Sequence, residues 1–224
     1  MGKEILADGI KHSHLLLTDT HCDHINGFPF FAPAFVKNET FHIYAGYLMD
    51  KGGIRKVFAS QMDNPVFPVP REAMQATLVF EDFQAGENLD LAKDVQVRTA
   101  LLNHPNDATG YRIDYQGKSM CLITDTEHIP GKPDQNILAL IKGADLVVCD
   151  STYTEEEFPN YIGWGHSTWE EGVRLCKAAN VKQLAIFHHD PKHDDVFMDQ
   201  VEIEANKAWS NTFVVREGMD IIID

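Results

Sequence analysis

The run LLLTDTHCDH, residues 15–24, constrains the fold of this chain more than any other feature. Its apolar first part predicts a buried strand over His14–Thr18. Four candidate metal ligands follow at spacings of one or two residues: Asp19, His21, Asp23 and His24. A strand that ends in such a loop can direct several oxygen and nitrogen donors into one small volume, as a metal site requires. A polar turn would explain any one of these side chains, but the four together predict a metal centre.

Length and composition predict a single domain that covers residues 1–224. The chain has 224 residues, of which 44% are hydrophobic, enough for a packed core. No stretch approaches the roughly 20 continuous apolar residues that cross a bilayer. The first 14 residues lack the basic and apolar blocks of a secretory signal. We therefore expect a soluble, cytoplasmic protein.

The charge balance narrows the class of substrate. The formal net charge is −15, and lysines and arginines form no basic stripe along the sequence. Long nucleic acids are disfavoured as substrates, because their binding draws on clustered basic contacts to phosphates. A small anionic ester remains compatible with the acidic chain, since bound cations neutralise acidic charge locally.

The four cysteines predict neither a zinc knuckle nor a disulfide framework, because they are widely spaced with no C-x-x-C pair. Cys22 lies inside the ligand run. Its side chain should alternate away from its neighbours His21 and Asp23, so we expect it not to bind metal.

Strands and helices alternate irregularly along the rest of the chain, which predicts a layered α/β arrangement. Strands are expected at 41–46, 76–83, 94–104, 144–150, 182–189, 212–217 and 219–224, with a hairpin over 111–125. Helices are expected at 52–64 and 136–144, after Ser167, and over 194–209. Ser167 and Glu170 have the spacing of a capping box. In the last helix, Phe197, Val201, Ala205 and Ala208 share one face.

Three further candidate sites lie where expected strands end. They are His104 in ALLNHP, Asp125 in CLITDTEH, and the pair His188 and His189 in LAIFHHDP. Chemistry is often placed at strand ends, because the backbone there is rigid while the side chains face an open edge. The ends of four strands, including the one before Asp19, are therefore expected to converge on one site.

Taken together, these motifs resemble a metallo-β-lactamase-fold hydrolase, in the branch that is similar to ribonuclease Z and small phosphodiesterases. The matching runs are TDTHCDH (18–24), NHP (103–105), TD (124–125), GWGHST (163–168) and FHHDP (187–191). They occur in the family's order from about Asp8 onward. The resemblance implies an αββα sandwich that holds two divalent metal ions, zinc first, with manganese or iron as alternatives.

The resemblance also implies a set of ligands. Asp19, His21 and His104 would bind the first ion, Asp23, His24 and His188 the second, and Asp125 would bridge both. His188 is preferred to His189 because it shares the parity of Leu184 and Ile186 on the expected strand, and His189 remains the alternative.

The implied activity is hydrolysis of a small phosphodiester by a hydroxide that bridges the two ions, with Asp23 and His166 in catalytic roles. Such a hydroxide is a nucleophile at neutral pH, and paired ions stabilise both the attacking and the leaving oxygen. His166 falls on the family's His-Ser-Thr element beside the scissile phosphate. Its imidazole could contact a phosphoryl oxygen or protonate the leaving alkoxide.

Two departures from the family pattern accompany this resemblance. Asp19 stands where the family has histidine, which should weaken the first metal site and shift its preference toward manganese or magnesium-like ions. Only about thirteen residues precede the ligand motif, so the sandwich is expected to lack its N-terminal strands. Uncovered apolar surface predicts a homodimer, or else a sequence missing its natural start. The alternative function is a degenerate, non-catalytic metal- or ligand-binding protein of the same fold.

Overall fold

The computed structural model describes residues 2–223, which form two compact units, 2–84 and 85–223. Among the described residues, no helix combines the length and the apolar character that crossing a bilayer requires. A single domain over 1–224 stays a prediction.

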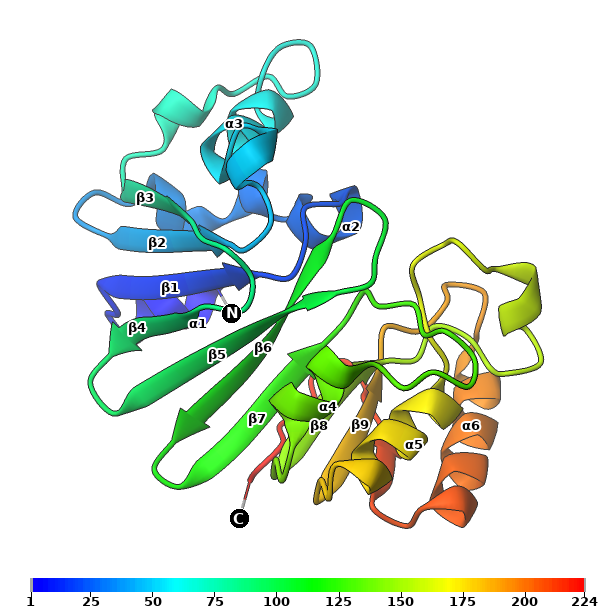
Figure 1. Ribbon diagram of the computed structural model, residues 1–224. Coiled ribbons are helices and arrows are strands. Elements are labelled where there is room, and N and C mark those ends of the chain that lie inside the picture. Colours follow the sequence, from blue (N-terminus) through cyan, green and yellow to red (C-terminus); the bar gives the residue numbers. More distant parts are fainter. Residues whose placement is uncertain (1, 224) are drawn as a thin grey trace. The chain divides into compact units, whose positions relative to one another are not determined.

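The first unit is built on a three-stranded parallel sheet in the order β1-β2-β3 (Figure 1). Its strands are β1 (His12–Leu17), β2 (Thr40–Ala45) and β3 (Thr77–Asp82). Alternation along the strands sends Leu15, Ile43 and Phe80, which are paired in register, to the same face. That face forms a core with Ile54 and Phe58, so the expected strands of this unit are confirmed.

The helices of the first unit are short. They are α1 (Gly2–Ala7), α2 (Cys22–Ile25) and α3 (Ile54–Gln61), with 3-10 turns at Phe28–Phe30, Ala32–Phe35, Met49–Lys51 and Arg71–Ala73. Of these, α2, α3 and the first two 3-10 turns add buried residues to the core of the unit. Pro29 and Pro33 lie in the first two 3-10 turns, because proline cannot donate the hydrogen bonds of a continuous α-helix. α2 begins within the ligand run and is preceded by His21 at its N-cap position.

The second unit is built on a seven-stranded mixed sheet in the order β10-β9-β8-β7-β6-β5-β4. The strands are β4 (Asn88–Ala92), β5 (Val95–Leu102), β6 (Ala108–Tyr115), β7 (Lys118–Ile123), β8 (Leu146–Asp150), β9 (Gln183–Phe187) and β10 (Thr212–Val214). β4 to β7 are joined antiparallel, whereas β7 to β10 run parallel. β5 therefore points the same way as β7, β8 and β9, and these four strands end at one edge of the sheet.

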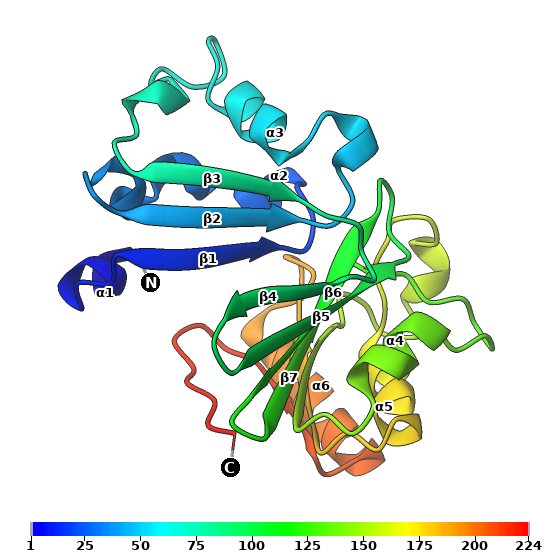
Figure 2. The same ribbon diagram turned by 60° about the vertical axis from the view of Figure 1, so that its left-hand side comes forward.

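Three helices lie side by side against the second sheet (Figures 1 and 2). They are α4 (Gln135–Ile141), α5 (Trp169–Ala178) and α6 (Asp195–Ala208), with a 3-10 turn at Phe158–Asn160. Their buried residues, such as Ile141, Cys176 and Val201, form one core with Ile123 and Ile186 of the sheet. Burial of a large apolar side chain contributes about 1.5–3 kcal/mol to folding stability. This core therefore holds in place the strands whose ends carry the polar residues described below.

Some expected elements are wrong in detail. The N-cap of α5 is Thr168, whose hydroxyl accepts from Glu171 N at 3.2 Å. Ser167 does not cap the helix, because its hydroxyl lies 2.8 Å from His128 Nδ1.

The elements expected from the sequence are also wrong near the C-terminus and at the outer strand of the second sheet. Residues 219–223 form no strand, and Asp224 lies outside the described residues. On α6 the buried positions are Met198, Val201 and Ala205, so Phe197 and Ala208 do not belong to the core face. The outer strand β4 was not expected.

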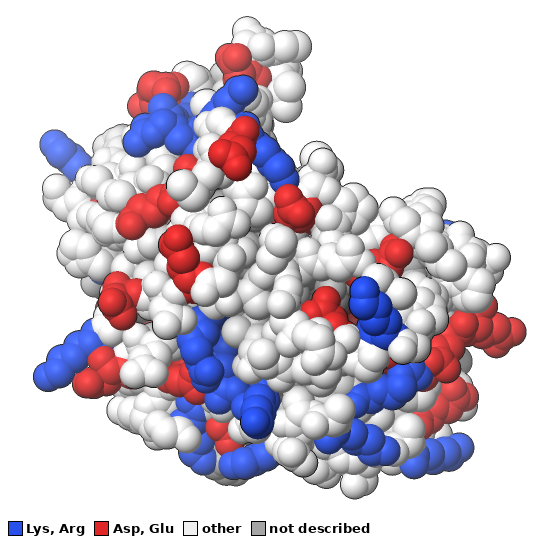
Figure 3. All heavy atoms as spheres, viewed as in Figure 1, with Lys and Arg blue, Asp and Glu red and all other residues white. Residues whose placement is uncertain are grey.

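Charges of both signs are interspersed on the face drawn in Figure 3. Acidic residues outnumber basic ones by 34 to 19 along the chain. The face drawn therefore shows no continuous basic surface of the kind that binds long nucleic acids.

Candidate functional site

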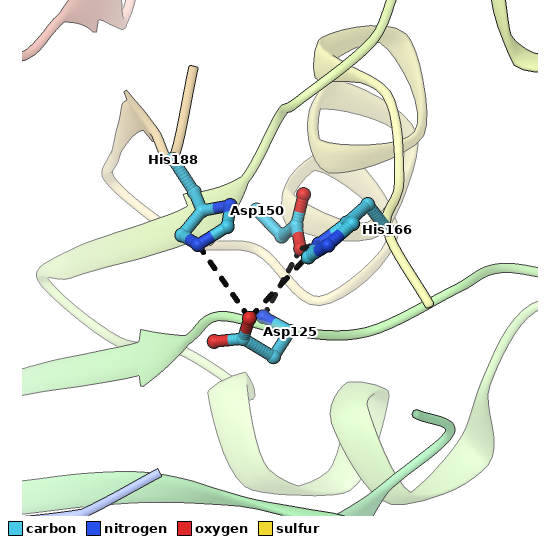
Figure 4. A group of neighbouring side chains, drawn as sticks. All are labelled: Asp125, Asp150, His166 and His188. Carbon is cyan, nitrogen blue, oxygen red and sulfur yellow. Dashed lines mark hydrogen bonds and ion pairs between the residues drawn. The ribbon is translucent and has the colours of Figure 1, made fainter. Parts of the chain in front are cut away.

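Four polar side chains of the second unit meet at the edge where β7, β8 and β9 end (Figure 4). Asp125 follows β7, Asp150 is the last residue of β8, His188 follows β9, and His166 lies just before α5. One ligand atom from each of the four lies within 4.8 Å of the others. Parallel strands bring their carboxyl ends to the same edge, so the topology explains why residues far apart in sequence gather here.

Asp150 is the fixed centre of this group. Its side chain is fully buried, and six donors lie within hydrogen-bond distance of its carboxylate. Oδ2 accepts from His166 Nδ1, Asp125 N and Thr126 N, and Oδ1 accepts from Thr152 N, Thr152 Oγ1 and Ser167 N. This number of donors offsets the loss of hydration that a buried carboxylate suffers. Asp150 therefore ties three separate loops together.

His166 has its orientation and tautomer set by Asp150. Its Nδ1 donates to Asp150 Oδ2 at 2.9 Å, which leaves Nε2 as the nitrogen for chemistry. Burial alone would lower the pKa of His166, but the hydrogen bond to Asp150 and the negative charges of Asp150 and Asp125 outweigh burial and raise it. An imidazole held in this way can give a proton to a leaving group or contact an anionic oxygen.

His188 belongs to the group, and His189 does not. The Nδ1 of His188 lies 3.0 Å from the Thr152 hydroxyl, and its Nε2 lies 3.5 Å from Asp125 Oδ1. The ring of His189 turns the other way, with Nε2 donating to the Ile186 carbonyl at 3.1 Å. As a metal ligand, His188 stays a prediction.

Asp125 and His188 share an unusual backbone conformation. Both have φ near +60°, at 59° and 63°, in the left-handed region that few residues other than glycine adopt. Such conformations cost about 1 kcal/mol or more and persist where surrounding contacts impose them. Here Asp150 accepts from Asp125 N, and Thr152 Oγ1 lies 2.8 Å from the His188 carbonyl. The two side chains are thereby directed toward each other.

His104 enters the same edge from the end of β5. Its Nδ1 donates to the carbonyl of Gly165 at 2.8 Å, and its ring lies 5.4 Å from that of His166. Gly165 has a φ of +91°, and a Cβ there would come within 2.1 Å of His104 Nδ1. Only glycine allows the loop to approach His104 this closely. A bond at Nδ1 of this kind fixes the ring orientation, as is usual for metal-binding histidines.

Glu127 fixes the loop that contains Gly165. Its Oε2 accepts from Gly163 N at 2.7 Å and from Gly165 N at 2.9 Å, and its own backbone bonds twice to Asn103. One carboxylate therefore anchors the turn between Tyr161 and His166 on both sides of Trp164.

Sequence reasoning missed both Asp150 and Glu127. Asp150 ends the buried run LVVCD, just as Asp125 follows CLIT, and that parallel could have identified it. Nothing local distinguishes Glu127, because its partners lie 36 and 38 residues away.

The first unit gathers the opening motif into a second group. Asp19 is buried, with Oδ2 2.6 Å from His21 Nδ1 and Oδ1 3.6 Å from His24 Nδ1. Nε2 of His24 lies 3.2 Å from Asp23 Oδ2, and Asp23 is largely exposed. The four residues that follow β1 thus lie together, as their spacing predicts. Cys22 is exposed, and its role as a non-ligand stays a prediction.

The donors of these groups are of the kind that divalent metal ions take. Carboxylate oxygens and imidazole nitrogens suit zinc, manganese and iron, and thiolates are not involved. In the second unit, Asp125 and His188 have donor atoms 3.5 Å apart, and the other nitrogen of His188 is occupied by Thr152. Metal-binding histidines usually have this kind of second contact. The residues therefore fit a metal ion.

The fold is a layered α/β arrangement with carboxylate and imidazole groups gathered at one strand edge, a class that includes many metal-dependent enzymes. Within that class, the chain belongs to the family described as the beta-lactamase superfamily domain, whose model matches residues 5–189. The fold expected from the sequence, of the metallo-β-lactamase type, is confirmed, as is the relation to ribonuclease Z-like proteins.

Individual relatives agree with this family. The ribonuclease Z of Saccharolobus islandicus is 38% identical over 116 residues, which are 52% of this chain and only 36% of the relative. The short form of human tRNase Z has a similar structure, with a TM-score of 0.68, 16% identity, and coverage of 94% of this chain and 79% of that one. A diphosphatase from the PhnP family gives a TM-score of 0.67 at 17% identity, covering 99% and 76%. These structural likenesses show the fold.

Proposed function

We propose that this protein is a metal-dependent hydrolase of small phosphodiesters. The observation that carries the proposal is the set of three imidazoles in the second unit, on His104, His166 and His188, each with Nδ1 bonded to a protein oxygen. The bond at Nδ1 fixes the orientation of each of the three rings. Hydrogen bonds to Nδ1 that fix ring orientation are typical of metal and catalytic histidines.

The ligands proposed from the sequence, for two divalent ions with zinc first, are Asp19, His21, Asp23, His24, His104, Asp125 and His188. When bound, the ions would supply a nucleophile from water at neutral pH and neutralise the charge of the phosphate. This assignment is supported by the family membership and by the order of the motifs along the chain.

His166 has a separate proposed role. Because Asp150 holds Nδ1, Nε2 of His166 can contact a phosphoryl oxygen or protonate the leaving alkoxide. Asp150 acts through His166 as a positioning residue. Asp23, which is largely exposed, is the other proposed catalytic group, as a ligand that also orients the attacking water.

The substrate is proposed to be small and anionic. Among the relatives in fold, one is named a tRNase Z and another a diphosphatase, so the family spans large and small phosphate compounds. The net charge of −15 favours the small class.

The test combines metal analysis with turnover. Elemental analysis of the purified protein should find about two ions per chain, and bis(4-nitrophenyl) phosphate should be hydrolysed with zinc, manganese or iron added back. His166→Ala should lower kcat by roughly 10²–10⁴-fold while leaving the metal content unchanged. One ion or none, with no turnover, would favour the non-catalytic alternative. Turnover that rises in Asp19→His would identify a weakened first site.

A homodimer is also proposed. In the described residues β1 pairs with β2 alone, so it ends the three-stranded sheet, and an edge strand is where a second chain can add. Light scattering should give twice the mass of one chain, and a monomer at all concentrations would refute the dimer.

A further inference from the structure

The loop before His166 carries an exposed tryptophan that the proposed chemistry does not use. Trp164 is 63% exposed, although aromatic residues near a motif are usually buried in the core. The indole lies two residues from His166, on the segment that Glu127 anchors through Gly163 N and Gly165 N. Its backbone is therefore fixed on both sides, and a ligand that contacts it need not order the loop.

Trp164 is also the outer end of a series of aromatic rings. The ring of His166 lies 6.3 Å from that of Tyr153, which stacks on Tyr161 at 4.3 Å with an interplanar angle of 5°. The rings of Tyr161 and Trp164 lie 5.5 Å apart at 86°, in an edge-to-face arrangement. Each ring thus touches the next from the proposed catalytic histidine to the surface.

Lys192 contacts Tyr161 through its hydroxyl and its ring. Its Nζ donates to the Tyr161 hydroxyl at 3.3 Å and lies 5.4 Å from the ring centroid. The ring of Tyr161, which contacts Trp164, is therefore fixed by stacking on Tyr153 and by the bond from Lys192 to its hydroxyl, which places a positive charge close to the loop.

We propose that Trp164 forms a stacking subsite for a flat aromatic ring carried on the substrate's phosphate ester. A large exposed ring on an anchored backbone, two residues along the chain from the group that would contact the phosphate, suits a planar π face. Stacking on such a ring is favourable for aryl groups and nucleobases alike. This subsite rests on the proposed function, and it adds the chemistry of the substituent that the phosphodiester bears.

Direct binding tests the subsite without requiring turnover. Calorimetry on the manganese-loaded protein would compare phenyl phosphate with cyclohexyl phosphate, which matches it in size but lacks a flat π face. Thymidine 5′-phosphate would report whether a nucleobase is accepted as well as a simple aryl ring. The wild-type protein should bind phenyl phosphate roughly ten-fold more tightly than cyclohexyl phosphate.

Three variants make the comparison specific. Trp164→Ala should remove the preference for phenyl phosphate, and Trp164→Phe should retain part of it. Ile162→Ala is the matched control, because Ile162 is also 63% exposed on the same loop and offers no ring. An unchanged preference in Trp164→Ala, or an equal loss in Ile162→Ala, would overturn the proposal.

The outcome separates this inference from the proposed function. A Trp164-dependent preference in a protein that hydrolyses no phosphodiester would leave the subsite standing and refute the hydrolase. Turnover of phosphodiesters with equal affinity for phenyl and cyclohexyl phosphate would refute the subsite and leave the hydrolase standing.

Discussion

Removing the Glu127 carboxylate should disable the site without unfolding the protein. Glu127→Ala deletes the only side-chain acceptor that the structure shows for Gly163 N and Gly165 N, at 2.7 and 2.9 Å. Hydrogen bonds to a charged group contribute about 1.5–3 kcal/mol each. Because Glu127 is half-buried, water can replace part of its hydrogen bonding to the two glycine N–H groups. The loop should therefore lose roughly 2–3 kcal/mol of stabilisation in its present position.

That loss acts through the two histidines that the loop positions. Gly165 would no longer place its carbonyl for His104 Nδ1, and His166 follows it in the chain. A displacement of about 1 Å in a catalytic group can lower the rate 10²-fold. We expect kcat/KM of Glu127→Ala to fall by roughly 30–100-fold, equivalent to about 2–3 kcal/mol.

Glu127→Gln is the conservative comparison, because one amide oxygen can accept from both glycine N–H groups. Its kcat/KM should stay within about ten-fold of the wild type, since neutral hydrogen bonds are about half as strong as charged ones. Glu156→Ala, which removes an exposed carboxylate, should have no effect.

A readout that does not depend on activity comes from the imidazole nitrogens. Two-bond ¹H–¹⁵N spectra of histidine-labelled protein should show His104 protonated on Nδ1 in the wild type and in Glu127→Gln, and a tautomeric mixture in Glu127→Ala. Wild-type kcat/KM together with an unchanged His104 spectrum in Glu127→Ala would refute the anchoring role.

Three further outcomes can be measured. Lys182 and Ser119 lower the pKa of Asp145 to about 2, against a usual value of 3.8. The ionised carboxylate should therefore add roughly 1–2 kcal/mol to the free energy of unfolding above pH 4, and this stabilisation should be lost as pH falls toward 2. Urea unfolding of metal-free wild type and Asp145→Asn should show a stability difference that shrinks over that range, and a difference constant from pH 6 to 3 would contradict it. Gly165→Ala should destabilise the protein by about 2 kcal/mol or more and lower metal affinity, because its Cβ would collide with His104; thermal melting and metal titration would show this, and a wild-type melting temperature would refute it. His188→Ala should lower the metal-to-protein ratio, whereas the same change at His189 should only destabilise; elemental analysis decides, and equal losses would contradict the assignment.

The buried strands were predictable from sequence, because apolar alternation and turn residues are local signals. The parity argument at β9 placed Leu184 and Ile186 in the core. His188 lies just beyond the strand in a left-handed conformation, and its choice over His189 as a ligand stays a prediction. β4 was missed because only Leu89 and Leu91 mark it, and the strand lies half-exposed at the edge of its sheet.

The polar network of the site was less predictable. A buried carboxylate such as Asp150 looks like any acidic residue until distant segments supply its donors, which come from residues as far as 25 positions away. The prediction that Ser167 caps helix α5 was wrong for the same reason. His128, 39 residues upstream, takes the hydroxyl that the local pattern assigned to the helix. Local rules identify what a residue can do, and tertiary contacts decide which option it takes.

The anchoring of one short turn by Glu127 separates the parts of the site that can vary from those that cannot. Gly163 and Gly165 are fixed through their backbones, while Ile162 and Trp164 project from the same turn into solvent. Diversification confined to positions 162 and 164 would therefore alter the surface beside the site without moving His104 or His166. A selection library at these two positions is the economical route to new ester preferences on this scaffold.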